Sequence, residues 1–140
     1  MTIVVAGIVA ATVLPRFGGR HGFEERGLRD ETAAALRYAQ KSAIASRRWV
    51  CVNFTANSVT ATVAPGFSVA ANCAGGAALE GPTGGALAVN ATGGSSFSAF
   101  PAGGVAFSPL GRPNAGAVIS VADLPGALAI TVEQETGYVN

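Results

Sequence analysis

The sequence predicts an α+β fold, in which a long N-terminal helix packs on an antiparallel β-sheet or β-sandwich. Apolar residues recur at helical spacing up to Arg48, and from Trp49 onward apolar and polar residues alternate with the period of two that strands require. Fourteen of the 19 glycines and six of the seven prolines follow Cys51, so tight turns are concentrated in the second part. A chain of 140 residues with 49% hydrophobic residues has room for one domain with a sizeable core.

The first element is an uninterrupted apolar run over residues 1–14, which ends at Pro15. As a helix the run covers roughly 21 Å, less than the bilayer's hydrocarbon core of about 30 Å. A cleaved signal peptide fits less well, because no charged segment precedes the run and no small-residue cleavage site follows it. Pro15 predicts a kink. The run contains two pairs of small residues four positions apart: Ala6 with Ala10, and Gly7 with Ala11. This spacing allows close packing between helices, and it also occurs in an ordinary lipid anchor.

The second element is an amphipathic helix over residues 23–48. Its apolar positions recur every three or four residues and form a stripe of mostly small side chains: Leu28, Ala35, Leu36, Ala39, Ala43 and Ile44. Glu25 and Arg29 can pair one turn apart. Such a stripe suits packing against a sheet.

The strands begin with a predicted hairpin of residues 49–54 and 59–63, joined by a turn at 55–58. Alternation places Cys51 on the face opposite Val50, Val52 and Phe54. Residues 64–85 have neither period and contain six glycines, which predicts a long irregular loop. Further strands are expected at residues 86–90, 95–100, 105–108, 117–121, 127–132 and 137–139.

The two cysteines, Cys51 and Cys73, lie in no CxxC or Cys/His pattern, so the sequence predicts no metal site. In an oxidising compartment they can form a disulfide between the first strand and the long loop. Two buried free thiols are the alternative.

The charges predict neither an enzyme nor a nucleic-acid-binding protein. Residues 1–50 carry eight basic and four acidic residues, a balance of +4, whereas residues 51–140 carry one basic and four acidic, a balance of −3. The basic residues of the helix are interleaved with acids, and no set of aromatic residues for base stacking accompanies them. His21 is the one histidine, and no paired carboxylates or phosphate-binding glycine motif are present. We therefore expect no catalytic residues and no cofactor.

Three segments together carry a resemblance to a known family. They are residues 31–48 with the stretch LRYAQ, residues 105–111 (VAFSPLG), and residues 130–132 (ITV) with 136–139 (TGYV). With the apolar run ending in LPRF, they closely resemble the minor pseudopilins of the GspH/FimT family, which are type IV pilin-like proteins. The resemblance covers nearly the whole chain except residues 64–85.

The resemblance implies a pilin-like fold and a non-catalytic subunit of a type II secretion pseudopilus or a type IV pilus, including the mannose-sensitive haemagglutinin type. Such a subunit acts in filament assembly and protein secretion. Residues 1–22 would be a truncated transmembrane and polymerisation helix kinked at Pro15, and residues 23–140 a periplasmic head, with the helix at 23–48 and the β-rich part at 49–140. The expected partners are other pilins or pseudopilins and the inner-membrane assembly platform, and the expected location is the bacterial inner membrane, with a single span.

The family's leader, its glycine cleavage position and its methylated phenylalanine have no counterpart here, so we expect truncation or a misplaced start. Adding roughly eight residues would give an apolar segment of about 22, close to what a bilayer requires. Arg16 and Arg20 after the run favour a cytoplasmic body by the positive-inside rule, whereas the resemblance implies a periplasmic one. Two alternatives remain: a DNA-uptake minor pilin of the FimT kind, although no basic residue follows Arg112, and a membrane-anchored β-sandwich that acts as a binding module or enzyme.

Overall fold

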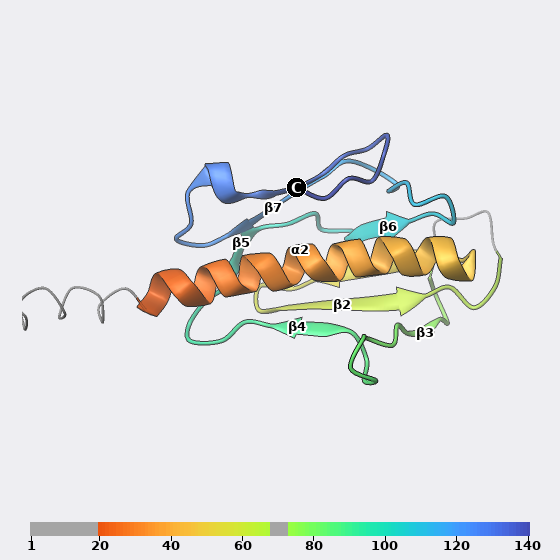
Figure 1. The fold of residues 1–140 in the computed structure, drawn as a ribbon, viewed down its shortest axis with the longest axis horizontal. Helices are drawn as coiled ribbons and strands as arrows, with labels where there is room; N and C mark the ends of the chain where they lie inside the picture. The colour runs from red at the N-terminus through yellow and green to blue at the C-terminus, as the bar shows by residue number, and fades with distance from the viewer. Residues whose placement is uncertain (1–19, 68–72) are drawn as a thin grey trace, which may run out of the picture.

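The fold is α+β, with one long helix packed on antiparallel sheets, as the sequence predicts. It was analysed in a computed structural model that describes residues 20–67 and 73–140. Figure 1 shows the helix lying lengthwise over the strands of the β-rich part. Within the described residues, no helix has the length and apolar character needed to cross a membrane.

Helix α2 spans Arg20–Ser46 and has 27 residues, so it begins earlier and ends earlier than the predicted 23–48. Five of the six predicted stripe positions are buried, and the sixth, Ile44, is 47% exposed. Glu25, Thr32 and Ala33 are also buried, although the predicted stripe does not include them. The helix ends because Arg47 adopts φ 55, a left-handed conformation that a non-glycine residue seldom takes. Arg47 and Arg48 therefore lie outside the helix.

The first sheet contains the predicted hairpin. Strands β1 (Val50–Phe54) and β2 (Ser58–Val63) pair antiparallel, with Val50 opposite Val63, and β6 (Val105–Phe107) pairs with the other side of β1. The backbone N–H of Thr55 donates to the carbonyl of Ser58 in the predicted turn.

Beyond β2, the edge of this sheet is formed by two short strands in line with each other. The first of them lies within residues 64–85, where a long irregular loop was expected. Strands β3 (Ala77–Ala78) and β4 (Ala88–Asn90) both pair antiparallel with β2, opposite successive parts of it. Between them residues 79–87 leave the sheet as a hairpin-like excursion. The excursion closes where Leu87 N–H donates to the carbonyl of Leu79, and a bridge joins Glu80 and Ala86. The prediction for residues 64–85 was therefore wrong in its last part.

The second sheet has the order β5-β7-β8, formed by Phe97–Ala99, Ala117–Val121 and Ile130–Val132. Strand β7 has the predicted bounds, whereas the predicted strand at 127–132 begins as a short 3₁₀ helix, Gly126–Leu128. The strand predicted at 137–139 is reduced to a single bridge between Val139 and Val132. All the strand pairs in the described part of the chain are antiparallel.

One hydrophobic core joins the helix to both sheets. Its largest fully buried apolar side chains come from all three: Phe107, Leu36, Ile119, Ile130, Val50, Val52, Val105 and Val139. A second apolar contact links the sheets directly, because the ring centroid of Phe54 on β1 lies 6.1 Å from those of Phe97 on β5 and Phe100. The helix and the two sheets thus form a single unit.

Candidate interaction sites

The predicted membrane and helix-packing residues lie outside the described part of the chain. These are Ala6, Gly7, Ala10, Ala11 and Pro15. They remain predictions from the sequence.

The predicted disulfide is present between Cys51 and Cys73, whose Cα atoms are 6.1 Å apart. As alternation predicted, Cys51 lies on the face of β1 opposite the buried side chains of Val50 and Val52. The bond ties the chain ahead of β3 to the first strand. It closes a segment with a sequence separation of 22, which restricts the unfolded chain.

The described residues bring together no recognisable catalytic or metal-binding constellation. Among them no group of three His, Cys, Asp or Glu side chains could hold a metal ion. Their two ion pairs, Arg29 with Asp30 and Arg112 with Glu135, lie at the surface, where such pairs contribute little.

The three segments that carry the family resemblance meet at the side chain of Gln40. Its amide nitrogen donates to the carbonyl of Gly111 at 2.9 Å and to the carbonyl of Thr136 at 3.3 Å. Gly137, at φ 72, packs so closely that a Cβ atom there would overlap the carbonyl oxygen of Gly111. One helix side chain thus fastens two turns that lie far apart in the sequence.

Two arginines of the helix hold the chain's C-terminal residues in a similar way. The guanidinium of Arg37 donates two hydrogen bonds to the carbonyl of Val139, and that of Arg29 donates to the carbonyls of Leu128 and Asn140. Within LRYAQ, Leu36 and Ala39 are fully buried, while Arg37 and Gln40 bind backbone carbonyls. The stretch therefore attaches the helix to the sheets.

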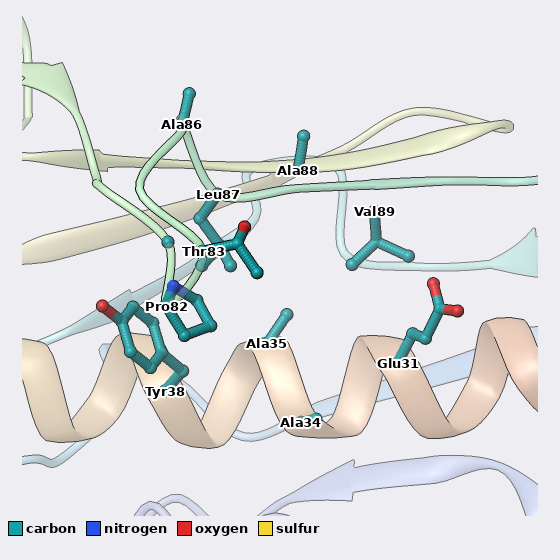
Figure 2. A pocket seen from close by; sticks show the side chains of 11 residues that line it. Glu31, Ala34, Ala35, Tyr38, Pro82, Thr83, Ala86, Leu87, Ala88 and Val89 are labelled. Atoms are coloured by element: carbon teal, nitrogen blue, oxygen red, sulfur yellow. The ribbon is translucent and has the colours of Figure 1, made fainter.

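Tyr38, the remaining member of LRYAQ, marks one end of a groove between α2 and the sheet edge. Its hydroxyl donates to the carbonyl of Glu80 at 2.9 Å, which holds the excursion of residues 79–87 beside the helix. Figure 2 shows Pro82 next to the Tyr38 ring, with Glu31 two turns away along the helix. The pocket between them has a volume of about 540 Å³ and is lined by Glu31, Ala34, Ala35, Tyr38, Gly81, Pro82, Thr83, Ala86, Leu87, Ala88 and Val89.

The groove is apolar at its base and acidic at its rim. Ala35 and Val89 are buried beneath it, whereas Glu31 is exposed, and no residue that lines it is basic. No pattern along the sequence predicted this groove. The signals that were present are the breakers Gly81, Pro82 and Gly85, which mark a turn but not the direction in which it folds.

Comparisons with models of protein families, with curated proteins and with solved structures found no match to this chain.

Proposed function

We propose that the protein is a non-catalytic minor pilin or pseudopilin, a subunit of a type II secretion pseudopilus or a type IV pilus. The observation that carries the proposal is the convergence at Gln40. The three segments that resemble the GspH/FimT family are distant in sequence, yet they meet around one helix side chain. This arrangement supports the proposal, because one helix side chain hydrogen-bonds to the backbone of both other segments.

In this proposal the apolar run of residues 1–14 sits in the bacterial inner membrane before assembly, and the head lies in the periplasm. During assembly the run exchanges lipid for the apolar helices of other pilins or pseudopilins, with the inner-membrane platform driving the transfer. Lipid and helix surfaces are similarly apolar, so the packing of the small residues Ala6, Gly7, Ala10 and Ala11 decides the outcome. The Cys51–Cys73 disulfide is consistent with an oxidising compartment.

A long helix attached along its length to a head suits this mechanical role. In the proposal, force on the apolar run is transmitted through α2. The side chains of Arg29, Arg37 and Gln40 donate hydrogen bonds that attach α2 to the C-terminal half of the chain. DNA binding has less support. Three of the nine basic residues, Arg29, Arg37 and Arg112, are already engaged by backbone carbonyls or by Glu135, and residues 51–140 carry a net charge of −3, which disfavours binding to phosphates.

The test is to tag the gene at its own locus with alkaline phosphatase after Asn140, so that any residues encoded ahead of Met1 are included. We expect phosphatase activity, membrane fractionation and alkylation-resistant Cys51 and Cys73. We also expect recovery of the untagged protein in sheared filaments, or its cross-linking to other pilin-like subunits. The matched control deletes the codons for residues 1–14 and should lose activity and membrane association.

An inactive fusion with free thiols would contradict the periplasmic placement. A membrane-bound periplasmic protein that cross-links to no pilin-like subunit would favour the membrane-anchored binding module. A shift of DNA by the purified protein at physiological salt would favour the DNA-uptake alternative.

A further inference from the structure

The outer side of strand β4 offers unpaired backbone groups. In the register of β2 and β4, Val59 lies opposite Val89, and the N–H of Ala91 donates to the carbonyl of Asn57. Hydrogen-bonded pairs alternate in antiparallel strands, so the N–H and C=O groups of Ala88 and Asn90 point away from β2. Among the described strands none pairs with that outer side.

The groove described above lies next to this edge. A strand added beside β4 would direct alternate side chains toward α2, as Val89 does, and these side chains would enter the pocket over Ala34 and Ala35. The pocket's volume of about 540 Å³ lies within the range of about 300–1,000 Å³ found for ligand sites. The excursion of residues 79–87 limits the added strand at one end.

The charges around the groove select a cationic occupant. Glu31 lines the groove, Glu80 lies on the excursion beside it, and Glu24 lies two helical turns from Glu31, against the turn at Gly93 that follows β4. Within the described part of the chain none of these three carboxylates takes part in an ion pair. Glu31 is the one charged residue of the lining, so a Lys or Arg side chain beside it is attracted and meets no basic residue there.

We propose that this groove binds an extended polypeptide segment of another protein, which adds a strand to β4 and places an apolar side chain, flanked by Lys or Arg, in the pocket. The backbone edge provides affinity for any extended chain, and the pocket and carboxylates provide the sequence preference. The pocket is long enough for one side chain of such a strand and its neighbours on the same face: Glu31 and Tyr38 are separated by seven helical residues, about 10.5 Å, and two cations with three residues between them are about 13 Å apart on a strand. This inference does not rest on the proposed filament role.

The test is a fluorescence-anisotropy titration of the full chain with the blocked, labelled peptide Thr-Lys-Thr-Val-Thr-Lys-Thr, whose Lys and Val side chains share one face of a strand. Two matched probes accompany it: a peptide with Glu in place of both Lys residues, and the Lys peptide with N-methylated backbone amides on the pairing edge. We expect binding of the first peptide only, weakened by added salt.

Variants of the chain locate the binding site. Ala34→Arg places a bulky cation in the groove from an exposed helix position, and we expect at least a tenfold loss of affinity with an unchanged melting temperature. Glu31→Gln should weaken binding about two- to fivefold. Glu133→Gln removes an exposed carboxylate of the C-terminal turn, outside the groove lining, and should leave affinity unchanged.

Three results would overturn the proposal. The first is no binding of the Lys peptide, and the second is equal binding of the N-methylated or acidic peptide. The third is self-association that Ala34→Arg abolishes in the absence of peptide binding, because it would assign the groove to a second copy of this chain. If the protein binds the Lys peptide but is not found in filaments and cross-links to no pilin-like subunit, only the proposed function is contradicted.

Discussion

Replacing Gly137 with alanine should destabilise the protein far more than the same change at Gly75. Both glycines have nearly the same positive φ, 72 at Gly137 and 75 at Gly75. A Cβ atom at Gly75 would meet no atom within 4 Å, whereas one at Gly137 would overlap the carbonyl oxygen of Gly111 and crowd the amide of Gln40. Comparing the two alanine variants therefore separates the cost of backbone strain, which both have, from the cost of steric overlap, which only Gly137→Ala has.

The size of each effect follows from these contacts. An alanine in the left-handed region costs about 1–2 kcal/mol, of which the lower entropy of the unfolded chain returns about 0.4–1 kcal/mol. Gly75→Ala should therefore lower the free energy of unfolding by about 1 kcal/mol. At Gly137 the backbone must also move, which costs about 1–3 kcal/mol as overpacking does, and the hydrogen bonds that Gln40 donates to Gly111 and Thr136 are lost at about 1 kcal/mol each. The expected total is about 4–6 kcal/mol.

Urea unfolding of the oxidised chain, followed by circular dichroism, measures both variants against the parent. In thermal unfolding, at about 4 °C per kcal/mol for a chain of this size, the melting temperature should fall by about 16–24 °C for Gly137→Ala and about 4 °C for Gly75→Ala. Equal losses in the two variants would refute the reasoning, because backbone strain would then account for the whole effect and the contact with Gly111 for none of it.

Four further variants have expected effects on the free energy of unfolding, measured by the same urea denaturation. Replacing Cys51 and Cys73 with alanine should cost about 3 kcal/mol through loop entropy, and no difference between the variant and the oxidised parent would contradict this. Leu36→Ala, at a fully buried position, should cost about 3–5 kcal/mol, whereas Ile44→Ala, at a position 47% exposed, should cost under about 1 kcal/mol. Arg47→Gly should stabilise by about 1 kcal/mol because it relieves φ 55, and a loss of stability would show that the Arg47 side chain contributes more than its strain costs.

The elements that the sequence predicted well are those whose pattern is local. The hairpin of β1 and β2 follows from alternation over several residues and a polar turn, and its register places Val50 and Val52 in the core. The helix stripe is equally local. The disulfide was predicted as one of two alternatives, because strand alternation placed Cys51 on a face that the chain near Cys73 could reach.

The elements that were missed depend on tertiary contacts. Strand β3 has two residues and β4 has three, and each is defined only by pairing with β2. The helix ends at Arg47, a position where the sequence lacks the glycine that commonly marks a helix C-terminus. The groove required the excursion of residues 79–87 to fold toward the helix, and this direction is set by one hydrogen bond from Tyr38 to the carbonyl of Glu80. No pattern along the chain encodes such a contact.

Within LRYAQ, the residues that attach the helix to the sheets and the one that lines the groove have different tasks. Leu36 joins the helix to the sheets through the core, and Arg37 and Gln40 join them through hydrogen bonds to backbone carbonyls. Backbone carbonyls are present whatever side chains the partner segments carry. Their resemblance therefore supports a shared architecture and says nothing about a ligand. Three of the residues that line the groove, Gly81, Pro82 and Thr83, lie in the segment that the resemblance does not cover. If the groove binds a peptide, exchanging residues 79–87 should change the peptide preference while the hydrogen bonds at Gln40 keep the fold intact.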